Sequence, residues 1–81
     1  MEFYIGQIIN LSFPWAPQGT LACEGQTLDI NGHQALYSLI GNKFGGDYQK
    51  TFKLPDLRVN GQWPHEMVTV IVLDGCYPTR P

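Results

Sequence analysis

Apolar and polar residues alternate along the first part of the chain, from Phe3 to Phe13. The odd positions carry Phe, Ile, Gln, Ile, Leu and Phe, while Gly6 and Asn10 fall between them. A period of two is typical of a β-strand with one buried face, because successive side chains point to opposite sides of a sheet. Prolines on both sides of Trp15 then interrupt regular pairing, so the sequence predicts a first strand over residues 3–13.

The spacing changes to that of a helix after Asn31. Asn31 can accept a hydrogen bond from a backbone N–H at a helix start, and Gln34 can reach back to it as in a capping box. Gly41 is suited to the left-handed conformation that ends many helices. We therefore predict a helix of about two turns over residues 34–40, with an apolar stripe of Leu36, Leu39 and Ile40. Such a short helix is unstable alone, so this stripe must pack on a sheet.

A hairpin is predicted between these two elements. Thr20–Cys23 and Thr27–Ile30 are strand-like segments that flank Glu24 and Gly25. A short connection with a glycine able to take positive φ is typical of two antiparallel strands joined by a tight turn.

Two more strands are predicted after the helix. Thr51–Leu54 places Phe52 and Leu54 on one face, and Pro55 ends the pairing because proline has no N–H to donate. Val68–Leu73 reads VTVIVL, with apolar residues on both faces, which is the pattern of a central strand covered on both sides.

The length of 81 residues and the content of nine Gly and six Pro favour one small, loop-rich domain. A chain of this size buries only about 60–65% of its unfolded surface, so the core is small. The predicted fold class is α+β: a small, mostly antiparallel β domain with one short helix, at about residues 34–40, packed on the sheet.

Charge and hydropathy exclude two classes of partner. The net charge is −2, and the five basic residues form no stripe that could neutralise a phosphate backbone, so we expect no nucleic-acid partner. No apolar run approaches the roughly 20 residues that span a bilayer, so no membrane insertion is expected. The first residues also lack the pattern of a signal peptide, which predicts a protein made and kept in the cytoplasm of the producing cell.

No catalytic constellation is present in the sequence, and we expect no enzyme activity and no cofactor. Asp47 and Asp56 lie in turn segments where a side-chain bond to local backbone explains them, and Ser38 lies inside the predicted helix without a surrounding motif. Four residues are metal ligands by type but have none of the short spacings of structural zinc sites: Cys23, His33, His65 and Cys76. The two cysteines are interpreted as buried thiols that act as small apolar residues, rather than as a disulfide.

Residues with an apolar body and a polar tip are the candidates for contact with a partner or a glycan. Trp63 is the first of them, because it lies in a polar segment, Val59–Glu66, which is broken by Gly61 and Pro64 and is predicted to be a loop. The other candidate contact residues are Trp15, His65 and Tyr48.

Four sequence segments, in this order and spacing, resemble the phage tail collar domain that also occurs in proteins called microcystin-dependent. They are IGQI, FPWAPQGTLACEGQTLDI, ALYSLIGNKFGGD and TFKLPDLR, within residues 1–58. Residues 68–81 are similar to the closing strand and tail of longer members. Residues 59–67 form a short loop in place of the variable, glycine-rich insertion of those members, and Val59-Asn60 stands where the family usually has Gly-Arg. The whole chain, residues 1–81, is thus interpreted as a single collar-like domain.

The resemblance implies a structural protein of a phage virion tail. It would be a component or decoration of a tail fibre or baseplate involved in host attachment, built as a homo-oligomer, with a trimer favoured, and associated with other tail proteins. Some relatives carry a metal in the trimer core, which makes His65 a weak metal candidate. Two alternatives remain open: a glycan-binding module that recognises the host receptor, and a phage protein outside the virion that binds a host factor.

Overall fold

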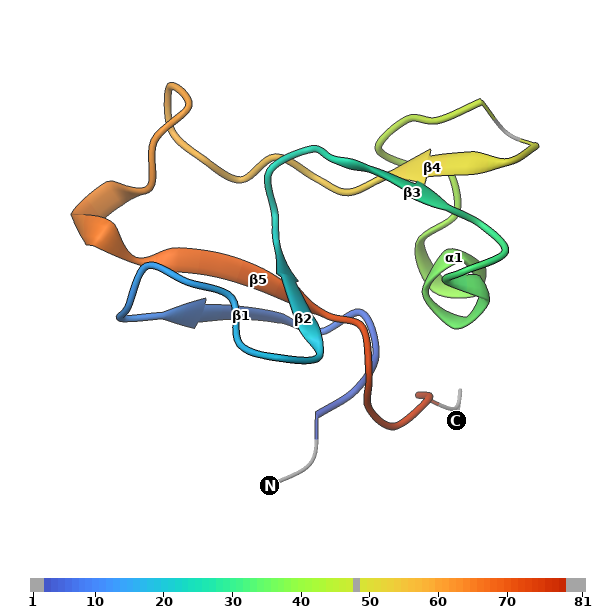
Figure 1. Ribbon diagram of the computed structural model, residues 1–81, viewed down its shortest axis with the longest axis horizontal. Coiled ribbons are helices and arrows are strands. Elements are labelled where there is room, and N and C mark those ends of the chain that lie inside the picture. Colours follow the sequence, from blue (N-terminus) through green and yellow to red (C-terminus); the bar gives the residue numbers. More distant parts are fainter. Residues whose placement is uncertain (1–2, 48, 79–81) are drawn as a thin grey trace.

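The computed structural model describes residues 3–47 and 49–78. The described chain contains five antiparallel strands in two sheets and one short α-helix, which confirms the α+β class (Figure 1). The elements in chain order are β1 (Ile8–Leu11), β2 (Thr20–Ala22), β3 (Thr27–Asp29), α1 (Gln34–Ile40), β4 (Thr51–Lys53), a 3-10 turn (Pro64–Glu66) and β5 (Val68–Val72).

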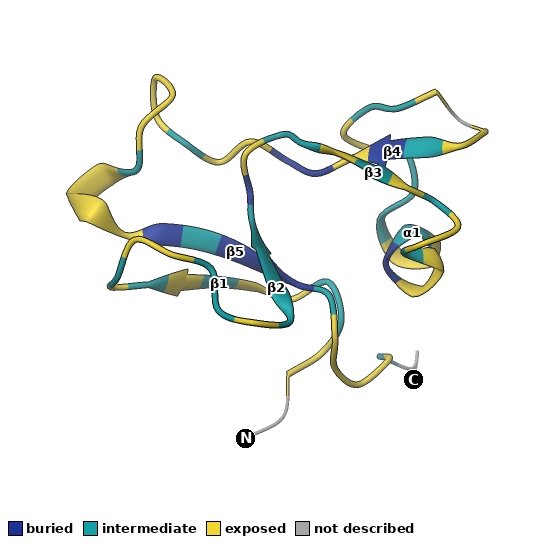
Figure 2. Cartoon of the chain, in the orientation of Figure 1, coloured by how far each residue is buried: buried dark blue, intermediate teal, exposed yellow. Residues whose placement is uncertain are grey.

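Strand β5 is the centre of the larger sheet, whose strand order is β1-β5-β2. It pairs with both neighbours in antiparallel register, with Ile71 opposite Ile8 on one side and opposite Leu21 on the other. Four of its five residues are buried, on both faces of the sheet (Figure 2). The prediction of a central strand over Val68–Leu73 is therefore confirmed, with the paired part ending at Val72.

The first strand is shorter than predicted. Only Ile8–Leu11 is regular, although Ile9 and Leu11 are less exposed than Ile8 and Asn10, as the alternation indicated. Gly6 interrupts the strand on its N-terminal side with a φ of 87°, a backbone conformation that no extended strand uses. Before it, Tyr4 forms an isolated bridge with Cys76 instead of joining β5.

The predicted hairpin is wrong, because β2 and β3 lie in different sheets. β2 pairs with β5, whereas β3 pairs with β4, and the chain runs from β2 directly across to the second sheet (Figure 1). The carbonyl of Ala22 accepts hydrogen bonds from the backbone of Glu24 and the side chain of Gln26. The N–H groups of Cys23 and Gly25 in this connection donate to Thr69 and Pro55, so the connection bonds to later segments and does not turn back on β2.

Helix α1 spans the predicted residues, but its N-terminal cap differs from the prediction. His33 occupies the capping position and no side chain bonds to the free N–H groups, so the expected capping box at Asn31 and Gln34 is absent. The helix ends as predicted at Gly41, whose N–H donates to the carbonyl of Tyr37 and whose φ is 57°. With seven residues and no cap, the helix depends on packing.

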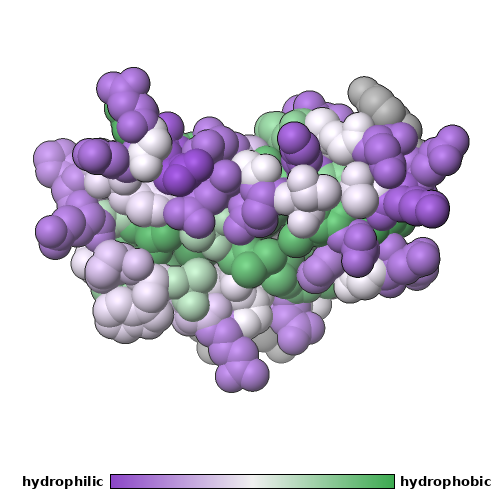
Figure 3. Space-filling model, turned by 45° about the horizontal axis from the view of Figure 1, so that its top comes forward, coloured by the Kyte–Doolittle hydropathy of each residue, from purple (hydrophilic) through white to green (hydrophobic). Residues whose placement is uncertain are grey.

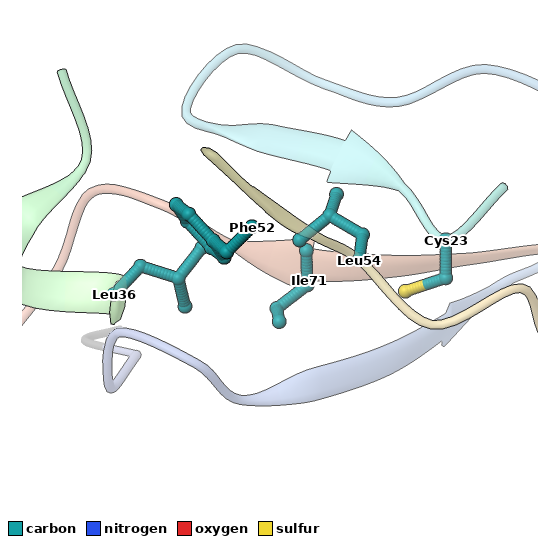
Figure 4. Packing of buried hydrophobic residues seen from close by; sticks show 5 residues of the cluster. All are labelled: Cys23, Leu36, Phe52, Leu54 and Ile71. Atoms are coloured by element: carbon teal, nitrogen blue, oxygen red, sulfur yellow. The ribbon is translucent and has the colours of Figure 1, made fainter. Parts of the chain in front are cut away.

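The core lies between α1 and the two sheets. Its buried members come from four segments of the chain and are shown in Figure 4: Cys23, Leu36, Phe52, Leu54 and Ile71. Phe52 is fully buried and its ring meets the ring of Tyr37 edge to face, with centroids 5.3 Å apart. Phe52 and Leu54 share one buried face, as predicted. Of the predicted helix stripe, Leu36 is buried in this core and Ile40 packs against it, whereas Leu39 is exposed because it lines the open hollow beside the helix.

Candidate interaction surface

The loop between α1 and β4 is held by Asp47. Its Oδ1 accepts three backbone hydrogen bonds at 2.9, 2.7 and 2.9 Å, from Gln49, Lys50 and Thr51. These bonds stabilise the carboxylate and lower its pKa to about 2. The predicted structural role of Asp47 is confirmed, because its carboxylate accepts hydrogen bonds from the backbone of its own loop.

Asn42 links the helix to β4 within the same segment. Its Oδ1 accepts a hydrogen bond from the Tyr37 hydroxyl at 2.7 Å, and its Nδ2 donates to the carbonyls of Gly45 and Thr51 at 3.3 and 3.1 Å. Sequence reasoning missed this role, because the partners of Asn42 are set by how the loop folds back on the strand. The segment GNKFGGD is therefore a built loop in which the side chains of Asn42 and Asp47 have structural partners.

The segment after β4 is fixed by a network around Arg58. Its guanidinium donates to both carboxylate oxygens of Asp56, at 3.0 and 2.9 Å, and to the Glu24 carbonyl at 3.3 Å. Arg58 holds the pKa of Asp56 down to about 2, and Asp56 also accepts the Arg58 N–H, as the predicted turn role requires. The LPDLR segment thereby ties residues 56–58 to the link between β2 and β3.

Trp63 belongs partly to this network. Its Nε1 donates to Glu24 Oε2 at 3.3 Å, and its side chain packs, half-buried, against the core. The sequence placed Trp63 in an open loop, whereas the structure leaves only part of its ring accessible.

The other described candidate contact residues are Trp15 and His65. Trp15 is 61% exposed and its ring packs on Phe13 with centroids 4.3 Å apart. His65 is exposed on the 3-10 turn with a φ of 56°, and Tyr48 lies outside the described residues. Since the ring pairs among the described residues are Phe13–Trp15 and Tyr37–Phe52, the two tryptophans are not stacked on one another.

The four residues that are metal ligands by type are also spread over the molecule. Within residues 3–47 and 49–78, no group of three or more His, Cys, Asp or Glu side chains is arranged to hold a metal ion. Cys23 is a buried free thiol in the core, as predicted, and burial raises its pKa to about 11. The prediction of a buried thiol is wrong for Cys76, which is exposed because it lies after β5, outside the core. His33 is at the start of α1, so it is not brought together with His65 by the described fold.

The structure instead shows an apolar hollow that the sequence did not indicate. A cavity of about 310 Å³ is open between α1, β1 and the segment after β4, lined by Gly6, Ile8, Leu39, Ile40, Lys43, Phe44, Pro55, Leu57 and Ile71. A second hollow of the same volume adjoins it, because Phe44, Pro55 and Leu57 line both. These linings combine residues far apart in sequence, so no local pattern could have revealed them.

Apolar side chains are exposed around this hollow and elsewhere. Ile8, Phe44 and Leu57 are 46, 42 and 44% exposed. Figure 3 shows that one face of the molecule carries a band of hydrophobic side chains between two hydrophilic margins. Contiguous apolar surface on a small protein indicates contact with other proteins. No described helix is long and apolar enough to cross a bilayer.

A comparison with protein families identifies the architecture. The model of the Phage Tail Collar Domain matches residues 6–60, more than half of the chain. The chain belongs to the phage tail collar domain family. In this collar domain the match begins just before β1 and ends just after Arg58, so it contains the GGD loop and the Arg58 network. No curated protein and no solved structure matches the chain.

Membership confirms the resemblance drawn from the four segments. The collar domain family is structural and is not known as catalytic, and it implies a role related to the tail fibre and an association with other tail proteins. In this chain β5, the central strand of the larger sheet, follows the matched region after a short loop.

Proposed function

We propose that this collar domain protein is a structural component or decoration of a phage tail fibre or baseplate, located in the virion tail and involved in host attachment. The family match over residues 6–60 is the observation that carries the proposal. The geometry supports it, since three charged residues of the shared segments, Asp47, Asp56 and Arg58, form hydrogen bonds within their own segments.

The test is the protein content of purified virions. Mass spectrometry of gradient-purified particles should find the chain in a constant ratio to known tail proteins, and gold-labelled antibodies should mark the tail in electron micrographs. Deletion of the gene should leave heads filled and impair adsorption. Its absence from purified virions would refute the tail role and favour the alternative of a phage protein that binds a host factor.

The same proposal includes self-association, with a trimer as the favoured state because tail fibres have a threefold axis. The support is a small core together with exposed apolar side chains on residues such as Ile8, Leu57 and Val59. Sedimentation equilibrium over a wide concentration range should give a mass above that of the 9.1 kDa chain. A clean monomer at high concentration, without affinity for fibre proteins, would contradict it.

A second candidate function is recognition of a host-surface glycan. The observation that favours it is Trp15, whose exposed ring is supported by Phe13 and could stack on the apolar face of a sugar. Trp63, the first candidate from the sequence, is the weaker one because it is half-buried and bonded to Glu24.

A glycan array probed with the wild-type protein and two variants distinguishes the roles of Trp15 and Trp63. Wild-type protein should bind host lipopolysaccharide glycans, Trp15→Ala should lose binding while keeping its melting temperature, and Trp63→Ala should lose stability through its core contacts. A blank array for the wild-type protein would remove this second function and leave the tail role untouched.

A further inference from the structure

The direction of the backbone hydrogen bonds in β5 shows which groups of β1 are unused. On one side, the Cys23 N–H donates to the Thr69 carbonyl at 2.9 Å and the Leu73 N–H donates to the Gly19 carbonyl at 2.8 Å. Odd-numbered positions of β5 therefore bond toward β2. On the other side, the Val72 N–H donates to the Gln7 carbonyl at 3.0 Å, so even-numbered positions bond toward β1.

The register then leaves two residues of β1 facing outward. Ile9 and Leu11 lie opposite Val70 and Val68, so they bond to β5. The N–H and C=O groups of Ile8 and Asn10 point away from the sheet, because adjacent residues of a strand bond to opposite sides. Among the backbone hydrogen bonds that the described residues form outside regular strands and helices, none involves Ile8 or Asn10.

This edge lacks two of the features that usually protect a strand from pairing, charged residues and proline, although β1 is short, with four residues. Residues 7–13 contain no charged residue and no proline, and Ile8 is 46% exposed. Natural edge strands are blocked by lysine, proline, bulges or a covering segment, since unpaired N–H and C=O groups are a template for another strand.

The cavity described above lies beside the same edge. Ile8 and its cross-strand neighbour Ile71 form one wall, and Leu39 and Leu57 contribute two others. A strand added next to β1 would place one side chain in register with Ile8 on the same face of the sheet. That side chain would point into an apolar hollow of about 310 Å³.

The charge at the cavity specifies the chemistry of the partner. Lys43 lines the cavity, and its ammonium lies 5.8 Å from the centre of the Phe44 ring. The ion pairs of the described residues all involve Arg58, so Lys43 is not neutralised by a described carboxylate. Lys53 lines the adjoining hollow. An otherwise acidic chain thus presents lysines at its apolar hollow, which complements a partner that is apolar and acidic.

We propose that the outer edge of β1 binds an extended segment of another tail protein by strand addition, with an apolar side chain in the cavity and a carboxylate facing Lys43. Main-chain bonds to Ile8 and Asn10 supply affinity, and the cavity with its lysine supplies specificity. The identification of the segment's source as a tail protein rests on the proposed function, whereas the binding edge does not.

The experiment uses two sets of fluorescent peptides and measures anisotropy with the full chain. One set covers the other tail proteins of the phage as overlapping segments. The other is designed: alternating valine and threonine with one leucine and one glutamate, and a matched peptide with lysine in place of glutamate. The glutamate peptide and at least one apolar, acidic tail segment should bind.

Two variants and one modified peptide test the mode of binding. Lys43→Glu should weaken binding of the glutamate peptide by about tenfold, whereas Lys50→Glu, the same charge change outside both hollows, should alter it by less than about twofold. Asn10→Pro removes an outward N–H and keeps the Ile9 and Leu11 backbone bonds to β5, so it should abolish binding. It also loses the bond that Asn10 Oδ1 accepts from the Thr69 hydroxyl at 2.6 Å, and Asn10→Ala, which loses that bond but keeps the N–H, is the control. N-methylation of the alternate peptide amides that face β1 should also abolish binding, whether or not the Asn10 variant folds, whereas methylation of the other alternate set should leave it unchanged.

Each other outcome is decisive. Two results would overturn strand addition next to Lys43. One is binding that survives N-methylation of each of the two alternate sets of peptide amides. The other is an equal effect of Lys43→Glu and Lys50→Glu on binding. If neither peptide set binds, the proposal is overturned. If the chain then self-associates with rising concentration and Asn10→Pro removes this association, the occupant of the edge is a second copy of this chain. If the designed peptide binds and no tail-protein peptide does, strand addition at β1 is supported and a tail protein as the source of the segment is refuted. This outcome separates the present proposal from the proposed function.

Discussion

Substitution of Gly46 by alanine should destabilise this protein strongly, because the glycine lies where the loop presses on β4. A Cβ built there would collide with the Thr51 carbonyl oxygen and lie 2.6 Å from Phe52 Cα, both backbone atoms that cannot move aside cheaply. The φ of 121° adds strain for any residue with a side chain. Phe52 is fully buried, so a shift of its backbone is transmitted into the core.

The expected loss of unfolding free energy is the sum of these two costs, and a control variant separates the steric cost from the backbone strain. Overpacking costs about 1–3 kcal/mol and positive-φ strain about 1–2 kcal/mol, so Gly46→Ala should lose about 2–5 kcal/mol of unfolding free energy. Gly61 has a φ of 77°, and a Cβ added there would meet no atom within 4 Å, so its change to alanine carries the strain alone. Gly61→Ala should therefore lose about 1–2 kcal/mol.

Urea unfolding followed by tryptophan fluorescence measures both losses. The two variants should keep the wild-type slope, so that changes in midpoint report stability. In thermal melts, each kcal/mol corresponds to about 4–8 °C for a domain of this size. Equal losses for Gly46→Ala and Gly61→Ala, or a Gly46→Ala variant as stable as wild type, would refute the close approach of this loop to β4.

Three further outcomes are expected. A chain ending at Glu66 should be insoluble or lack a cooperative melt, since it loses the central strand β5, and a soluble fragment that melts cooperatively would contradict this. Asp47 and Asp56 have pKa values of about 2 in the fold against an ordinary 3.8, so the unfolded chain binds their protons first. Their stabilisation should be present above about pH 4 and lost as the pH falls toward 2; melts of Asp47→Asn should show a weaker acid dependence than wild type. In a Cys76→Ser variant, Cys23 should react with a thiol reagent at pH 8 only on unfolding, because it is buried with a pKa of about 11.

Elements with a strong local signal were predictable from the sequence. The helix over residues 34–40 ends where a glycine permits positive φ, and the apolar run of β5 indicated a strand buried on both sides. The turn roles of Asp47 and Asp56 were also predictable, because an aspartate bonds to backbone groups only a few residues away. The four family segments sufficed to indicate the collar domain.

Strand partners were not predictable, because pairing joins residues distant in sequence. Thr20–Ala22 and Thr27–Asp29 are strands as expected, yet each pairs with a segment from the second half of the chain. The burial of Trp63 has the same origin, since Glu24, its hydrogen-bond partner, lies 39 residues away.

Sequence by itself determined the local conformations of this protein: where backbone dihedral angles favour a helix, where glycine or proline ends an element, and which faces must be buried. Tertiary structure alone decided which edge of β1 is unpaired and that Lys43 and Leu57 share a cavity with Ile8. The physical reason is that local conformation depends on neighbours a few residues apart, whereas an edge or a cavity exists only after distant segments have packed.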